Sequence, residues 1–187
     1  MKPRLGFALC GSFCTHSKAL DVMRTLAENC DIVPILSEAA AYTDTRFGTA
    51  VMLRETVSGI SSKKPVLTIA EAEKFASNPL DYLIICPCTG NTLAKLACGI
   101  TDTAVTMAAK AHLRTDRPLL IALASNDAMS ANFRNIGTML GRKNIYFVPM
   151  LQDDAVSKPH SLVADMTRVS LCYEAMKERR QIRPLFL

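Results

Sequence analysis

Short, almost wholly apolar runs recur along the chain and alternate with longer stretches in which apolar residues have helical spacing. Runs of this length, rich in Leu, Ile and Val, are typical of parallel strands that are buried on both faces. We expect strands at Arg4–Cys10, Asp31–Ser37, Asp81–Cys86, Pro118–Ala124 and Asn144–Pro149.

The stretches between these runs predict helices. In Ser17–Asn29, for example, Ala19, Met23 and Leu26 fall on one face. The same reasoning predicts helices over Thr45–Ser58, Ile69–Ser77, Asn91–Cys98, Thr103–Leu113, Met129–Leu140 and Ser161–Arg180. Alternation of strand and helix predicts an α/β fold, a doubly wound parallel sheet with right-handed crossovers and helices on both faces.

Neither an internal repeat nor an interdomain linker interrupts the pattern, so we expect residues 1–187 to form one domain. The loop around Gln152–Pro159 is polar. The tail, residues 177–187, is first basic and then apolar, and it ends in Leu185-Phe186-Leu187. Two interpretations of this tail stay open: it packs back on its own domain, or it docks on a partner chain.

Composition narrows the function classes. The net charge of +5 is spread along the chain, which favours anionic small molecules over nucleic acid. No run reaches the roughly 18 apolar residues of a membrane helix, and the N-terminus lacks the pattern of a signal peptide. The seven cysteines have no disulfide-framework spacing, so we expect mostly buried, reduced thiols and a cytoplasmic protein.

The most informative segment is Cys86–Asp102, which follows the apolar strand Tyr82–Ile85 and opens a helix with small polar residues. Backbone N–H groups at the start of a helix, beside hydroxyl and amide side chains, suit a polar cofactor at the carboxyl edge of a parallel sheet. The segment therefore predicts a cofactor site.

Similar polar groups follow other strands: Gly11 and Ser12 after the first, Ser37 at the end of the second, and Ser125 and Asn126 after the fourth. Considered one at a time, each of these clusters can also be explained as an ordinary helix N-cap. Because the carboxyl ends of parallel strands meet at one rim, the clusters together favour binding of a phosphate-bearing ligand. The first turn is not GxGxxG, so the dinucleotide fingerprint is absent, although NADP remains an alternative ligand.

Other chemistries fit less well. Cys86-x-Cys88 lacks the spacing of a zinc knuckle or a CxxC redox pair, and we expect no metal site. Cys10-x-x-x-Cys14 with His16 is the remaining metal-binding alternative. A Cys nucleophile with a His base is a further alternative, and its base would have to be His16, His112 or His160.

The segment Pro87–Asp102 resembles the Pro-Ala-Ser-Ala-Asn-Thr signature of the homo-oligomeric flavin-containing Cys decarboxylases and the Pro-Cys-Ser-Met signature of the related flavin prenyltransferases. The resemblance covers about residues 4–150. It implies a flavodoxin-like, Rossmann-like three-layer fold, FMN held partly between protomers, and homo-oligomers that are trimers or multiples of trimers.

Carried onto this chain, the resemblance implies three groups of FMN-binding residues. Gly11, Ser12 and Ser37 would hold the phosphate. The ribityl chain and ring would be lined by Pro87, Thr89, Asn91 and Thr92, and the ring edge would lie near Ser125 and Asn126.

The chain departs from the family at its reactive groups. The decarboxylases carry a catalytic His shortly before the strand that leads into the long motif, whereas Pro65–Ala70 contains none. Their Pro-x-Met-Asn-x-x-Met-Trp signature is degraded to Ala124–Ser130, and the chain has no Trp. The Arg-Glu-x-Pro-Leu segment of the prenyltransferases is absent after Leu123. Decarboxylation and prenyl transfer are therefore not favoured.

Within the superfamily, the Gly11–His16 start and the basic tail resemble one component of a two-component oxidoreductase from spore-forming bacteria. This resemblance implies a second, different chain as partner, and oxidation of a partly reduced pyridine ring with the flavin as hydride acceptor. Candidate groups for catalysis or for binding an anionic substrate are His16, Lys18, Lys95 and Arg134. A non-catalytic scaffold role remains the alternative.

Overall fold

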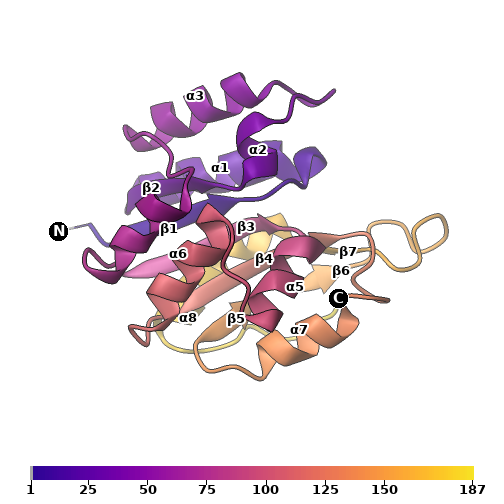
Figure 1. Ribbon diagram of the computed structural model, residues 1–187. Coiled ribbons are helices and arrows are strands. Elements are labelled where there is room, and N and C mark those ends of the chain that lie inside the picture. Colours follow the sequence, from indigo (N-terminus) through magenta and orange to yellow (C-terminus); the bar gives the residue numbers. More distant parts are fainter. Residues whose placement is uncertain (1) are drawn as a thin grey trace.

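Parallel strands form the centre of the computed structural model, which describes residues 2–187 (Figure 1). The parallel strands are β1 (Arg4–Leu9), β2 (Asp31–Leu36), β3 (Tyr82–Cys88), β4 (Leu119–Ser125) and β5 (Ile145–Phe147). They lie in the order β2-β1-β3-β4, and β5 pairs with β4. Crossing from β2 past β1 to β3 reverses the direction of winding, so the predicted doubly wound α/β fold is confirmed.

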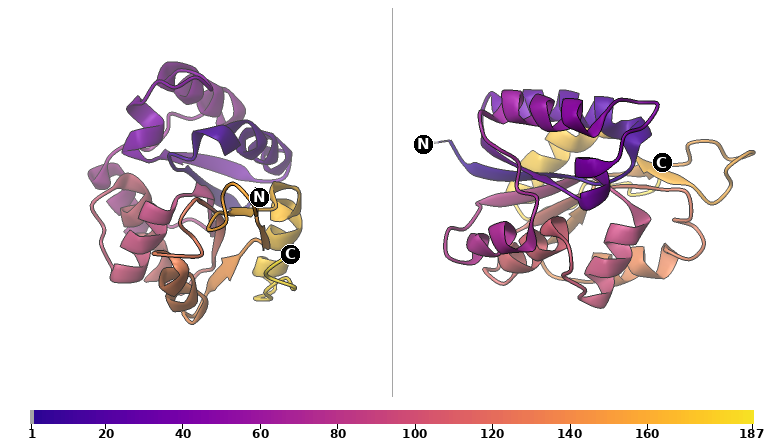
Figure 2. Two further views of the ribbon diagram at one scale, coloured as in Figure 1. Left: turned by 90° about the vertical axis from the view of Figure 1, so that its right-hand side faces the viewer. Right: turned by 45° about the horizontal axis from the view of Figure 1, so that its top comes forward.

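Helices cover both faces of the sheet, giving three layers (Figures 1 and 2). One face packs against α1 (His16–Ala27), α2 (Glu38–Tyr42), α3 (Ala50–Ser61) and α8 (Val169–Lys177). The other face packs against α4 (Ile69–Glu73), α5 (Gly90–Cys98), α6 (Ala104–Leu113) and α7 (Phe133–Leu140). Short 3₁₀ turns are η1 (Phe13–Thr15), η2 (Lys74–Ala76) and η3 (Met166–Arg168).

The strands are apolar throughout because their side chains enter two separate cores. In β1, Phe7 and Leu9 point to the core under α1 and α8, whereas Ala8 points to the core under α5 and α6. All three side chains are fully buried. This alternation explains why the sequence shows continuous apolar runs rather than an alternating apolar–polar pattern.

The C-terminal quarter differs from the prediction of a long helix over Ser161–Arg180, which is wrong. The segment begins with β7 (Leu162–Ala164), which pairs antiparallel with both β4 and β6 (Met150–Leu151), so the sheet is mixed. Here Leu162 and Ala164 are buried on a pleat, and the Asp165 side chain then caps η3, so that the helix proper starts only at α8. The loop between β6 and β7 projects from the body (Figures 1 and 2).

Three boundaries also move for local reasons. The helix expected at Thr45 begins at Ala50, because residues 45–48 form a tight turn and the Thr49 side chain caps α3. The helix expected at Met129 begins at Phe133, after turns within residues 127–132. A short helix that was not predicted, α2, follows Ser37, and β3 runs on to Cys88.

The C-terminal tail lies along β6. Met150 N–H donates to the Leu185 carbonyl at 2.8 Å, and Leu187 N–H donates to the Met150 carbonyl at 2.9 Å. The Leu185 side chain is buried, while Phe186 and Leu187 are about half exposed. The tail therefore packs on its own domain and leaves two apolar side chains at the surface. Within residues 2–187, no helix is both long and apolar enough to span a membrane.

The buried side chain of His112 makes the stability of the fold depend on pH. The His112 ring is 1% exposed; its Nε2 lies 2.8 Å from the Pro118 carbonyl, and its Nδ1 has no hydrogen-bond partner in the described chain. Burial lowers the pKa of His112 from 6.5. The unfolded chain therefore binds a proton at a pH where the folded protein does not, so stability is full above about pH 6.5 and falls as the pH drops toward the folded pKa.

We predict that, when the pH is lowered from about 7.5 to about 5.5, the free energy of unfolding of His112→Gln falls by less than that of the wild type. Urea unfolding at the two pH values measures the difference. The pKa of His16 is also lowered, so His16 contributes to the same pH dependence. The substitution at His112 should therefore reduce the change of unfolding free energy with pH without abolishing it. His160→Gln, on an exposed loop, is the matched control. Equal slopes in wild type and His112→Gln would contradict the interpretation.

Candidate functional site

The carboxyl ends of β1, β2 and β3 meet at one rim of the sheet. Cys10 N–H donates to the Pro87 carbonyl at 3.1 Å, and Ser37 N–H donates to the Leu9 carbonyl at 3.0 Å. These bonds extend the parallel pairing past the ends of β1 and β2, so the segments that follow all three strands lie together. The sites expected at Gly11, Ser37 and Thr89 thus share one surface.

A cleft of about 710 Å³ opens on this rim, within the range of small-molecule sites. One wall is made by residues that follow β1 and β3: Gly11, Ser12, Cys14, Thr15, Thr89, Gly90 and Asn91. The other wall is made by the end of β4 and the turn after it, and by residues of the β6–β7 loop and β7: Ala124, Ser125, Asn126, Asp127, Asp153, Lys158, Ser161 and Val163. A depression of about 600 Å³ shares Gly11, Thr89 and Asn91 with the cleft, and Ser37, Thr92 and Lys95 also line it. Of the nine residues that the resemblance assigns to FMN, Pro87 lies outside both: it is buried within β3.

Several of the hydroxyls are already engaged. Thr89 Oγ1 accepts from the backbone N–H of Thr92 at 3.3 Å, and Thr92 Oγ1 donates to Cys10 Sγ at 3.3 Å. Ser37 Oγ caps α2 by accepting from Ala40 N–H at 3.3 Å. These bonds fix the first turns of the helices, so that the first N–H groups of α5, at Gly90 and Asn91, are free to face a ligand.

A carboxylate network that the sequence did not reveal supports the far wall of the cleft. Ser125 Oγ donates to Asp127, and Asn132 Nδ2 donates to both Asp127 carboxylate oxygens, at 3.0 and 2.9 Å. Asn135 in turn donates to Asn132 Oδ1 at 2.8 Å. The hydrogen bond from Ser125 is the main cause of the lowered Asp127 pKa. Ser125 is therefore held by Asp127, whereas Asn126 is exposed to the cleft.

Glycine is required where this network meets α5. A Cβ on Gly90 would lie 2.3 Å from Ser125 Oγ, 2.6 Å from Asn132 Nδ2 and 2.8 Å from Asp127 Oδ1. The helix can approach the network this closely only without a side chain at this position.

The buried thiols at the rim are not nucleophiles. Burial raises the pKa of Cys10 to about 11 and that of Cys86 to about 12, and it raises the pKa of Cys88 well above its usual value. All three stay protonated at neutral pH. Cys14, by contrast, is exposed and lines the cleft.

The candidate cations are spread over the molecule. Lys18 and Arg134 are exposed on α1 and α7 and line neither the cleft nor the depression. Lys95 pairs with both carboxylate oxygens of Asp102 at 2.9 Å. The cation that does line the cleft is Lys158, which pairs with Asp153 at 2.6 Å. Sequence reasoning missed it because only the pairing of β6 with β7 brings this loop to the cleft.

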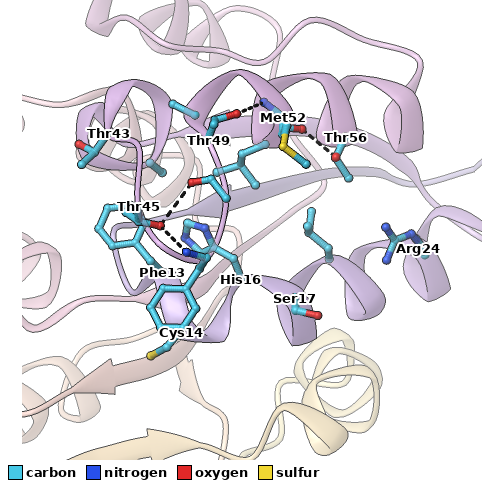
Figure 3. A pocket seen from close by; sticks show the side chains of 16 residues that line it. Phe13, Cys14, His16, Ser17, Arg24, Thr43, Thr45, Thr49, Met52 and Thr56 are labelled. Atoms are coloured by element: carbon cyan, nitrogen blue, oxygen red, sulfur yellow. Dashed lines mark hydrogen bonds between the residues drawn. The ribbon is translucent and has the colours of Figure 1, made fainter.

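His16 lies beside the cleft rather than in it. Its Nε2 is 2.7 Å from the Cys10 carbonyl, and its ring contacts the Phe13 ring edge-on. It lines a separate cavity between α1 and residues 43–56, which Figure 3 shows. Burial lowers the pKa of His16, so the ring is neutral at physiological pH.

The residues present fit the FMN that the resemblance implies. Beside the Gly11 turn, the rim offers the hydroxyls of Ser12 and Ser37 for a phosphate. The exposed amide of Asn91, at the start of α5, suits the ribityl chain and ring, and the exposed amide of Asn126 suits a ring edge. Among residues 2–187, no cluster of three or more potential metal ligands is present.

We predict that Gly90→Ala destabilises the protein by about 1–3 kcal/mol, because the new methyl group displaces Ser125 and Asn132 from Asp127. Chemical denaturation measures the loss. Gly137→Ala, in α7 with nothing within 4 Å of the new Cβ, is the control and should be neutral or slightly stabilising. Equal stability of the two variants would show that the close approach carries no constraint.

Comparison with known proteins identifies the family of this chain. A family model described as Flavoprotein matches residues 1–170. The B subunit of dipicolinate synthase from Bacillus subtilis is 34% identical over 98% of this chain and 93% of its own length. The crystal structure of the corresponding B subunit from Bacillus halodurans superposes with a TM-score of 0.90 at 35% identity, covering 100% of this chain and 98% of that chain.

A more distant structure shares the fold. The FMN-dependent cysteine decarboxylase SpaF superposes with a TM-score of 0.68 at 22% identity, covering 94% of this chain and 96% of its own. The chain therefore belongs to the Flavoprotein family, and within that family it is a homologue of the B subunit of dipicolinate synthase.

Proposed function

We propose that this protein is an FMN-binding component of dipicolinate synthase. Its partner would be the A subunit of dipicolinate synthase, and the two chains together would oxidise a dihydrodipicolinate-type precursor to dipicolinic acid during sporulation. The observation that carries the proposal is the shared rim, where free N–H groups and polar side chains from three strand ends line one cleft. Homology to the B subunit of that enzyme supplies the substrate class and the partner.

The residues that would hold FMN come from both sides of the cleft. Gly11, Ser12 and Ser37 would meet the phosphate, and Asn91 the ribityl chain and ring. Thr89 and Thr92 act indirectly by fixing the first turn of α5. Ser125 and Asn126 would lie at the ring edge. Bound FMN would accept a hydride from the substrate ring.

The substrate is an anion with carboxylate groups, and the cleft supplies one cation for it. Lys158 reaches the cleft from the β6–β7 loop, and its pairing with Asp153 raises its pKa. Exchange of Asp153 for a substrate carboxylate would keep the ammonium ion paired. Lys18 and Arg134 lie outside the cleft and are not retained for this role.

A scaffold role is the second candidate, and the sequence favours it at one point. Pro65–Ala70 lacks the His of the decarboxylases, and Thr68 instead caps α4. In this alternative the chain would bind its partner and shape the partner's site without reacting. We do not retain NADP, since the family model and the FMN-dependent SpaF point to flavin.

The proposed assembly is a homo-oligomer, a trimer or a multiple of one, in the cytoplasm of the mother cell of a spore-forming bacterium. The apolar side chains of Phe186 and Leu187, about half exposed, are available for contacts with a partner chain.

We predict that the purified protein quenches FMN fluorescence with a dissociation constant in the micromolar range. Ser12→Ala combined with Asn91→Ala should weaken binding about tenfold to a hundredfold, since each contact contributes on the order of 1 kcal/mol. Asn29→Ala combined with Ser170→Ala, away from the rim, is the matched control. Absence of FMN binding, with or without the partner chain, would exclude the flavoprotein proposal.

A second prediction separates catalysis from scaffolding. With the partner chain, precursor and FMN under anaerobic conditions, the flavin's visible absorbance should bleach in step with dipicolinate formation. Ser12→Ala with Asn91→Ala should slow both changes together. Dipicolinate formation at the wild-type rate in that variant would assign this chain a scaffold role.

A further inference from the structure

An apolar groove of about 300 Å³ lies beside the tail, between the start of α7 and β6 (Figure 1). All but one of its lining residues are apolar: Met129, Phe133, Met150, Gln152, Leu162, Phe186 and Leu187. About half of the surface of Phe133, Phe186 and Leu187 is exposed. Apolar side chains gathered at an open groove are typical of a surface that another protein covers.

At this groove the tail is the outermost segment of the sheet, because β6 pairs with β7 on one side and with the tail on the other. The hydrogen bonds of Met150 are made with the Leu185 carbonyl and the Leu187 N–H. The N–H and C=O groups of Phe186 therefore point away from β6, and within residues 2–187 neither has a hydrogen-bond partner. An edge of this kind is a template on which an extended segment can add as a further strand.

Cations flank the groove. Arg134 follows Phe133 in α7, and Arg183 lies in the tail. Both are exposed, and among the residues that the structure describes neither has a carboxylate partner. An apolar segment that also carries acidic side chains would complement this surface. A second copy of this chain would not, because a symmetric contact between two copies brings the same cations to both sides.

The groove adjoins the cleft through the β6–β7 loop. Met129, which lines the groove, donates its N–H to the His160 carbonyl at 2.9 Å. Gln152, which also lines the groove, donates Nε2 to the Pro159 carbonyl at 3.0 Å. A chain that fills the groove would therefore contact the residues that hold the loop carrying Lys158, which lines the cleft.

We propose that this groove docks the A subunit of dipicolinate synthase through an extended segment of that chain with apolar and acidic side chains. The inference rests on the proposed function, which requires a second, different chain. The segment pairs with the N–H and C=O groups of Phe186, inserts an apolar side chain beside Phe133, and places carboxylates near Arg134 and Arg183. Since a cavity of about 150 Å³ accepts benzene, the groove has room for a large apolar side chain.

Titration of this protein with purified A subunit, followed by calorimetry, tests the apolar contact. Phe133→Asp should weaken binding about thirtyfold, the loss typical of a central aromatic contact. Val51→Asp introduces the same charge at a residue of α3 that is 50% exposed, and it should bind like the wild type. Equal affinity of the wild type and Phe133→Asp, or a loss of affinity in Val51→Asp alone, would overturn the inference.

A pair of double variants tests the charges. Arg134→Glu with Arg183→Glu should slow association with the A subunit about tenfold at low salt, and by less at high salt. Lys64→Glu with Lys110→Glu changes the net charge equally at exposed residues away from the groove, and it should associate at nearly the wild-type rate. Equal slowing in both double variants would overturn the assignment of an acidic segment to this groove.

Hydrogen exchange tests the strand pairing. The Phe186 N–H is unpaired in the protein alone, and its exchange should slow about tenfold or more when the A subunit binds. Protection confined to residues 42–52, or none in the tail, would place the A subunit elsewhere and overturn the inference. Light scattering of the protein alone should give the same oligomeric mass for the wild type and Phe133→Asp. Dissociation of the variant would seat a second copy in the groove and would also overturn it.

FMN titration separates this inference from the proposed function. Without the A subunit, Phe133→Asp should bind FMN as the wild type does. If the wild type binds the A subunit through the groove but does not bind FMN, the flavin proposal fails and the docking site stands. If the A subunit binds the wild type and Phe133→Asp equally, the docking site fails and the proposed partnership stands. Absence of any binding to the A subunit would contradict both.

Discussion

The arrangement of the rim depends on one hydrogen bond at the centre of the sheet, from Cys10 N–H to the Pro87 carbonyl. It joins the carboxyl ends of β1 and β3 just where the register of β3 against β4 shifts, between Ile85 and Cys88. Because β1 and β3 are neighbours here, the turn after β1 and the first turn of α5 form one surface. The bond thus continues the β1–β3 pairing to the point where the turn with Gly11 meets the first turn of α5, which holds Asn91.

The polar groups of the rim divide into those that shape the site and those that face a ligand. Thr89, Ser37 and Ser125 use their hydrogen bonds on helix caps and on Asp127. Asn91 and Asn126 keep exposed side chains. This division accounts for the ambiguity of the sequence, since an N-cap and a ligand contact use the same residue types at the same place. Both interpretations hold, for different residues.

The buried strands and the shared rim could be predicted from the sequence because continuous apolar runs and strand-end polar residues are local signals. The β6–β7 pair could not, since Leu162 and Ala164 become a strand only by pairing with β4, far away in the chain. Lys158 and Asp127 were missed for the same reason: their places depend on tertiary pairing and on a turn closed by Asn132. Residues whose position depends on distant partners carry no local pattern.

The central claim is that these strand ends together hold FMN. Titration of isotope-labelled protein with FMN, followed through its backbone amide NMR signals, tests it most directly. The account predicts that the largest shifts fall on Gly11, Ser12, Gly90, Asn91 and Asn126, with little change at the opposite edge of the sheet around Arg117 and Arg179. Shifts that cluster at that opposite edge, or no shifts at all, would contradict it.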